Sequence, residues 1–151
     1  MLASGWNVNF LVFARSGLPL NVTQQQGVIS TGTNNRPDRI ASGKLDNPTP
    51  DHWFDLAGFT PTRDNTGTYG NSGRNILDQP GQLNVDLAVV KSTRFLDRFE
   101  HQFRLEMFNA FNHPLFAGPA SSIGASNAGV ISSLLFGTPM RQIQLAMKLS
   151  F

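Results

Sequence analysis

The sequence predicts an all-β protein of about four antiparallel strands, each about ten residues long. Three observations predict this fold. Apolar and polar side chains alternate in four segments, one connection between two of these segments is very short, and two other connections are long and rich in Gly, Pro and small polar residues. Alternation with a period of two is typical of a β-strand, because successive side chains point to opposite faces of the sheet.

The first alternating segment runs from Gly5 to Arg15. One of its faces is apolar throughout and the other is mixed. The apolar face consists of Trp6, Val8, Phe10, Val12 and Ala14, and the mixed face of Asn7, Asn9, Leu11, Phe13 and Arg15. The pattern predicts a strand with one face suited to an apolar environment.

The stretch from about Gln24 to Pro80 shows no sustained period and is rich in Gly, Pro, Asn, Thr and Asp. It is interpreted as a long loop of roughly 55 residues, well beyond the ~12 to 15 at which structureless loops become uncommon in compact domains. Within it, residues 51–59 (DHWFDLAGF) are expected to pack locally as a turn of helix or a brief strand.

Alternation returns at Gln82 and continues to about Phe95, and a third run covers residues 99–108. Only Leu96, Asp97 and Arg98 separate the two runs, so they are predicted to form a hairpin. The apolar faces consist of Leu83, Val85, Leu87 and Val89 in one run and of Phe99, His101, Phe103, Leu105 and Met107 in the other.

A helix over residues 97–111 is an alternative to the third strand, because Phe99, Phe103, Met107 and Phe111 are spaced by four. The strand is preferred, since the period-two division into faces is cleaner and a hairpin partner lies next to it in the sequence.

The region from Asn112 to about Pro139 is a second predicted long loop, of about 30 residues. A final strand then covers Gln142 to Phe151 without a break in its alternation. Its apolar face consists of Ile143, Leu145, Met147, Leu149 and Phe151.

The composition is consistent with membrane strands. The chain has 15% charged residues and a net charge of +2, whereas about 25% charged residues is usual for a soluble domain. It lacks any stripe of basic residues, so no nucleic-acid partner is expected. No segment approaches the roughly 18 continuous apolar residues of a membrane helix, which leaves a β-barrel as the way to cross a membrane.

The order of the connections predicts a topology. Outer-membrane barrels have short periplasmic turns and long external loops, so the two long segments are expected outside the cell and the hairpin turn in the periplasm. The main alternative is a soluble or secreted β-sheet ligand-binding module, in which Glu100, Gln102, Arg104 and Glu106 would form a solvated face instead of lining a wet lumen.

Four blocks of sequence, in this order, resemble the C-terminal barrel region of TonB-dependent receptors of the Oar-like type. They are GTYGNSGRNILDQPG, NVDLAVVKSTRF, FRLEMFNAFNHPLF and RQIQLAMKLSF. The resemblance implies a bacterial outer-membrane receptor with a barrel of about 22 strands closed by a plug, which imports a bulky substrate by energy-coupled transport. Residues 1–151 are then expected to be a fragment that lacks the plug and most of the strands.

The resemblance also implies partners. These are outer-membrane lipid, the barrel-assembly machinery, and a TonB-type energy-coupling protein that would contact the missing N-terminal part. Phe151 is expected to be the barrel-assembly signal, because it is an aromatic residue at the end of the final strand and in register with its apolar face.

No enzyme, cofactor or metal site is expected. The candidate acids and bases, His52, His101 and His113 with Asp51, Asp55 and Glu106, show no recognised catalytic spacing. Asp38, Asp46, Asp51, Asp55 and Asp64 lack the spacing of a calcium loop. The aromatic residues Trp53, Phe54, Phe59 and Tyr69 are candidates for an external ligand surface.

Overall fold

The computed structural model describes residues 3–25, 36–62, 69–95, 98–138 and 140–151. The chain divides into two compact units. Unit 1 consists of Met1–Arg15, Gln82–Leu115 and Gly137–Phe151, and unit 2 of Ser16–Gly81 and Phe116–Phe136. In the described ranges, no helix has the length and apolar character needed to cross a membrane.

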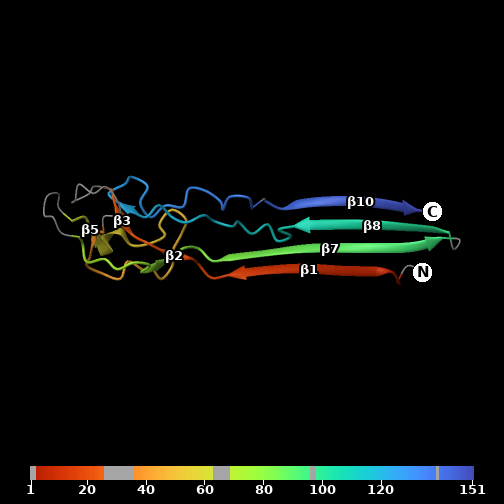
Figure 1. Ribbon diagram of the computed structural model, residues 1–151, viewed down its shortest axis with the longest axis horizontal. Coiled ribbons are helices and arrows are strands. Elements are labelled where there is room, and N and C mark those ends of the chain that lie inside the picture. Colours follow the sequence, from red (N-terminus) through yellow and green to blue (C-terminus); the bar gives the residue numbers. More distant parts are fainter. Residues whose placement is uncertain (1–2, 26–35, 63–68, 96–97, 139) are drawn as a thin grey trace. The chain divides into compact units, whose positions relative to one another are not determined.

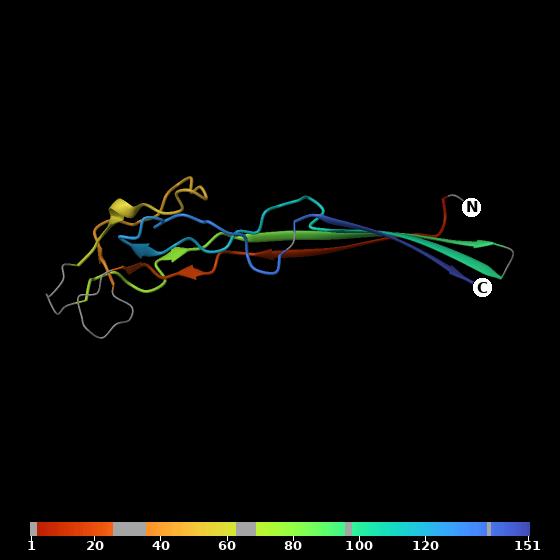
Figure 2. The ribbon, with the colours of Figure 1, turned by 90° about the horizontal axis from the view of Figure 1, so that it is seen from above.

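Unit 1 is built on a four-stranded antiparallel sheet with the order β1-β7-β8-β10 (Figure 1). Its strands are β1 (Trp6–Arg15), β7 (Gln82–Phe95), β8 (Phe99–Phe108) and β10 (Gln142–Ser150). These are the four predicted strands, so the prediction of an all-β fold is confirmed and the alternative helix over residues 97–111 is wrong. Figure 2 shows the four strands in one twisted layer, as the handedness of β-strands requires.

The register of the sheet joins the four predicted apolar faces into one. Val8 lies opposite Val89, Val89 opposite Leu105, and Leu105 opposite Leu145. Because side chains alternate with a period of two, one aligned row fixes the face on which each remaining residue of these strands lies. Within unit 1, the apolar side chains of the sheet therefore form a single continuous surface.

The strand pairs also show which connections share an end of the sheet. Arg15 lies opposite Gln82 and Phe108 lies opposite Gln142 at one end, whereas Phe95 lies opposite Phe99 at the other. Both long connections therefore leave and rejoin the sheet at the same end, and β7 and β8 pair as a hairpin at the opposite end. Of the predicted turn, Leu96 and Asp97 lie outside the described residues.

In its described residues, unit 2 contains only short elements. Its two-residue strands are β2 (Pro19–Leu20), β3 (Thr23–Gln24), β4 (Asp38–Arg39), β5 (Phe59–Thr60), β6 (Leu77–Asp78) and β9 (Ser122–Ile123), and its helix is the 3-10 turn η1 (Leu56–Gly58). β2 pairs with β6 and β4 with β5 in antiparallel fashion, whereas β3 and β9 pair in parallel. The expected turn of helix or brief strand in residues 51–59 is confirmed by η1 and the start of β5.

The two long connections fold together around a hydrophobic core, which the sequence did not predict. Six apolar side chains make up this core: Leu20, Val22, Phe54, Phe59, Leu77 and Ile123. Backbone hydrogen bonds join the two connections, from Trp53 N–H to the Gly129 carbonyl at 2.8 Å and from Ile131 N–H to the Pro50 carbonyl at 2.7 Å. Neither connection is therefore an open loop.

Candidate functional site

The apolar face of the sheet is exposed in this chain. Phe10 is 73% exposed, Met147 71% and Leu145 66%. Soluble monomers rarely present contiguous apolar patches larger than a few hundred Å², whereas the outward face of a transmembrane β-sheet is apolar along its whole span. This face is suited to lipid.

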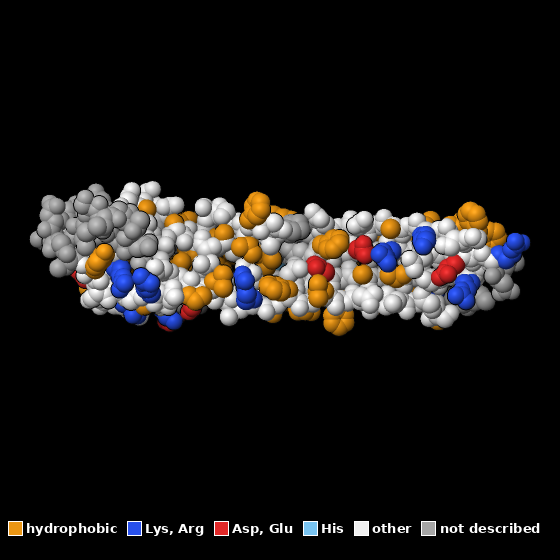
Figure 3. Space-filling model, viewed as in Figure 1, with side chains coloured by type: hydrophobic (Ala, Val, Ile, Leu, Met, Phe, Trp, Pro, Cys, Tyr) orange, Lys and Arg blue, Asp and Glu red, His pale blue; other side chains and the backbone are white. Residues whose placement is uncertain are grey.

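The opposite face of the sheet carries the polar and charged side chains. Figure 3 shows side chains of both charges along the sheet on the face in view. Arg104 and Glu106 form an ion pair at 3.4 Å on this face. Leu11, Phe13, Val90 and Phe108 are its larger apolar members, so the face is polar on average and not throughout. The predicted separation into an apolar and a polar face is confirmed.

The end of the apolar face near the hairpin carries aromatic and basic side chains. The Lys91 ammonium lies 5.0 Å from the centroid of the Trp6 ring and donates to the carbonyl of Ser4. Phe95 and Phe99 lie opposite each other at the same end. Amphipathic aromatic and long basic side chains are favoured where a membrane meets water, so this end has the chemistry of an interface.

His101 lies close to that end, opposite Thr93 of β7 and Leu149 of β10. Its predicted place near the hairpin turn on the apolar face is confirmed. In the described part of the chain, no group of three or more His, Asp or Glu side chains is arranged to hold a metal ion.

Asn109 organises the chain where β8 ends, in the segment FNAFNHP. It is buried and has a left-handed φ of 49°. Its side-chain amide donates to the carbonyl of His113 and accepts from the N–H of His113, both at 2.9 Å, and its own N–H donates to the Asp86 carboxylate at 2.9 Å. His113 therefore contributes its backbone to a turn.

A second asparagine completes this junction. Asn112 also has a positive φ, of 53°, and its side-chain oxygen accepts the N–H of Arg141 just before β10. Asparagine tolerates this conformation better than most residues. The FNAFNHP segment thus links β8, β7 and the start of β10 through two asparagines and Asp86.

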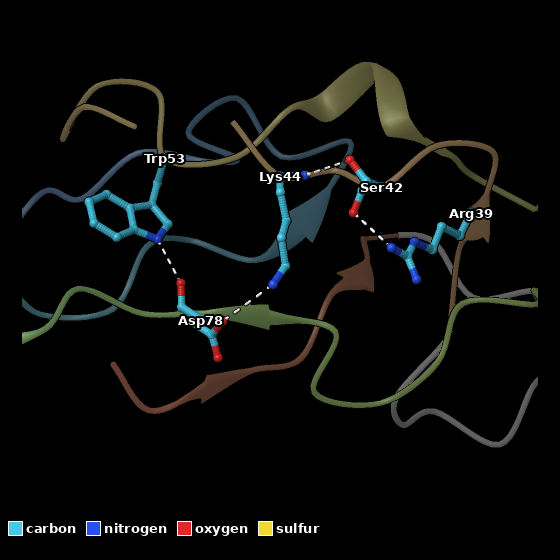
Figure 4. Close-up of polar contacts among 5 residues, drawn as sticks. All are labelled: Arg39, Ser42, Lys44, Trp53 and Asp78. Carbon is cyan, nitrogen blue, oxygen red and sulfur yellow. Dashed lines mark hydrogen bonds and ion pairs between the residues drawn. The ribbon is translucent and has the colours of Figure 1, made fainter. Parts of the chain in front are cut away.

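Unit 2 contains polar contacts among Arg39, Ser42, Lys44, Trp53 and Asp78 (Figure 4). The indole N–H of Trp53 donates to the carbonyl of Asp78 at 2.8 Å, and the Asp78 carboxylate lies 3.6 Å from the Lys44 ammonium. The Arg39 guanidinium donates to the carbonyls of Ala41 and Ser42. The two contacts of Asp78 join segments that are far apart in the sequence, whereas the contacts of Arg39 are local. Both partners of the ion pair between Lys44 and Asp78 are well exposed.

The predicted ligand surface of four aromatic residues is wrong for two of them. Phe54 and Phe59 are 1% and 4% exposed and pack edge to face with their ring centroids 6.0 Å apart. Trp53 packs against the same core. Tyr69 alone is well exposed. Large aromatic side chains supply much of the apolar area that a small core can bury. Phe54 and Phe59 are therefore buried in the core of unit 2 instead of lying on its surface.

Two acidic candidates of unit 2 accept backbone hydrogen bonds. Asp55 accepts the N–H of Ala57 and caps η1, and the Asp38 carboxylate accepts the N–H of Asn71. Asp64 lies outside the described residues.

Phe151 follows the last paired residue of β10. Ser150 lies opposite Glu100, and the Phe151 side chain is 96% exposed. Continuation of the register by one residue would bring Phe151 beside Phe99, on the apolar face. Its role as an assembly signal stays a prediction.

The strand order and the exposed apolar face define an antiparallel β-sheet protein that is embedded in a membrane. A family model described as an outer membrane beta barrel domain matches residues 1–144. The chain therefore belongs to the outer membrane β-barrel domain family, which places it in the outer membrane and disfavours the soluble or secreted module. Comparison with curated proteins and with solved structures finds no similar chain.

Proposed function

We propose that this chain is part of the barrel of a TonB-dependent receptor of the Oar-like type, which imports a bulky substrate across the outer membrane with energy from the inner membrane. Membership of the outer membrane β-barrel domain family supports the barrel. The four sequence blocks that resemble the end of such receptors support the finer assignment.

One observation carries the receptor part of the proposal. The two long connections, which leave the sheet at one end, fold into a unit with its own buried core. A barrel that serves only as an open pore needs loops that do no more than connect its strands. A folded unit instead holds side chains in fixed positions, as ligand recognition demands.

The edges of the sheet support a longer parent chain. β1 and β10 each have one neighbour in the sheet of unit 1, and a strand edge within a bilayer must be paired, because lipid offers no hydrogen bonds to the backbone. We therefore propose that further strands of a parent chain close the barrel.

The proposed partners follow from the resemblance to TonB-dependent receptors. They are outer-membrane lipid on the apolar face, the barrel-assembly machinery during insertion, and a TonB-type energy-coupling protein that contacts a part of the parent outside residues 1–151. No nucleic acid, cofactor or catalytic activity is part of the proposal.

Uptake by intact cells tests this function. We expect a strain that lacks the parent gene to lose uptake of at least one bulky solute from a panel, and a strain that lacks the energy-coupling protein to lose the same solute. Re-expression of the parent should restore uptake. Uptake that requires the parent gene but continues without the energy-coupling protein would instead identify a passive channel.

A further inference from the structure

Unit 2 also contains a polar pocket, and its described lining does not include Trp53 or its partner Asp78. Its volume is about 540 Å³. The described residues that line it are Asn21, Val22, Thr23, Arg36, Tyr69, Arg74 and Asn75. Val22 belongs to the hydrophobic core, so the pocket borders the buried core of the unit.

The described lining is rich in hydrogen-bond donors and lacks carboxylates. Arg36 and Arg74 bring two guanidinium groups, Tyr69 and Thr23 bring hydroxyl groups, and two asparagines bring amides. A guanidinium presents its donors in a fixed fork that matches the oxygens of a phosphate or carboxylate. The chemistry of this lining favours an anion.

Among the described residues, no acidic side chain forms an ion pair with either pocket arginine. The carboxylate of Asp38 accepts an N–H of Asn71, and that of Asp78 lies beside Lys44. Two like charges around one cavity repel each other unless an ion of opposite charge lies between them. A bound anion would relieve this repulsion.

Backbone contacts fix the segments that carry the two arginines. The N–H of Gly70 donates to the carbonyl of Arg36, and the N–H of Ser72 donates to the carbonyl of Pro37, both at 3.1 Å. A Cβ atom on Gly70 would lie 2.2 Å from the Pro37 carbonyl oxygen, so only glycine permits this approach. Pro37 and Ser72 are fully buried. These contacts hold the described backbone around Arg36 and Arg74 in place without a ligand, which lowers the entropic cost of binding.

We propose that this pocket binds a phosphate group, held between the Arg36 and Arg74 guanidiniums. The phosphate belongs either to a soluble ligand or to a phosphorylated lipid headgroup, since the same donors serve both. The inference goes beyond the proposed function, because anion binding holds whether or not the parent imports its ligand.

Calorimetric titration of the full-length parent in detergent with inorganic phosphate tests the inference. We expect saturable binding that weakens at least tenfold in Arg36→Gln and in Arg74→Gln, and that also weakens in high salt, because salt screens exposed charges. Arg141→Gln is the matched control, since Arg141 is exposed, belongs to unit 1 and lies outside the pocket. Arg74 is likewise exposed, so its replacement is expected to leave the protein folded, which heat-modifiable migration on a gel verifies.

A second arm distinguishes the two sources of phosphate. The parent is titrated with detergent micelles that contain a lipid ending in a phosphate monoester. Binding in this arm alone, lost in Arg74→Gln and kept in Arg141→Gln, supports the pocket and identifies a lipid headgroup as its ligand. Absence of binding in both arms, or equal binding by Arg74→Gln and Arg141→Gln, overturns the proposal.

Discussion

Leu105 of β8 lies directly opposite Leu145 of β10 in the antiparallel register of unit 1. On its other side, Leu105 faces Val89 of β7, which in turn faces Val8 of β1. One apolar side chain from each strand thus forms a row across the sheet. The row lies well away from the hairpin end, so it is expected to lie near the middle of the bilayer.

A charge in this row should destabilise the assembled barrel. We predict that Leu105→Arg lowers the free energy of unfolding of the full-length parent in lipid vesicles by about 2 to 4 kcal/mol, because a guanidinium at the bilayer midplane loses its hydration. Denaturant unfolding in vesicles measures this change.

Gln102→Arg is the matched control, because Gln102 is on the polar face of the same strand, where its amide donates a long hydrogen bond of 3.4 Å to Ser92. It should cost far less than Leu105→Arg. Equal costs at the two positions would mean that both faces meet water, and the lipid-facing assignment would fail.

The sheet could be predicted from the sequence because its signal is local. Each strand carries its own alternation, as in Ile143, Leu145, Met147 and Leu149, and the hairpin partner of β8 is separated from it by only a few residues. The predicted strand boundaries agree closely with the structure. The register follows from the requirement that the apolar faces of neighbouring strands coincide.

Unit 2 could not be predicted in the same way. Its strands are two residues long, too short to show a period, and its core joins Val22, Phe54 and Ile123 from segments that are distant in sequence. The buried aromatic residues therefore looked like surface residues of a loop. A signal was nevertheless present, because Phe54 and Phe59 are unusually large apolar residues for a solvated loop.

The core of unit 2 should depend on Phe54. We predict that Phe54→Ala destabilises unit 2 by about 3 to 5 kcal/mol, because it removes a large buried ring and leaves a cavity. Hydrogen exchange at the backbone N–H of Trp53, which donates to the carbonyl of Gly129, reports this loss. Phe136→Ala is the control, since Phe136 is fully exposed at 102%. Similar exchange rates in the two variants would contradict a packed core.

Asn109 should stabilise the junction after β8 in two separable ways. We predict that Asn109→Ala costs about 1 to 3 kcal/mol of unfolding free energy for the lost buried hydrogen bonds, together with the strain of placing alanine at a φ of 49°. Asn109→Gly removes the same side-chain bonds without that strain, so it should cost less. Asn7→Ala, at an exposed position in β1, is expected to cost little, and an equal loss in Asn109→Ala and Asn7→Ala would argue against the network.

Phe151 is expected to contribute to assembly of the barrel. The Phe151 ring follows the final paired residue of β10 and is almost fully exposed, so packing within this chain gives little reason for an aromatic residue there. We propose that the barrel-assembly machinery reads this ring together with the apolar face of β10. Deletion of Phe151 from the full-length parent should therefore sharply reduce the amount of assembled barrel.

Phe151→Tyr should be tolerated, because tyrosine keeps the ring and adds a hydroxyl group suited to the membrane interface. The measurement is the amount of heat-modifiable, folded protein in the outer membrane. The competing interpretation is that Phe151 is a frayed residue without a role. It predicts folded protein at the parental level after the deletion, an outcome that would remove Phe151 from the assembly signal.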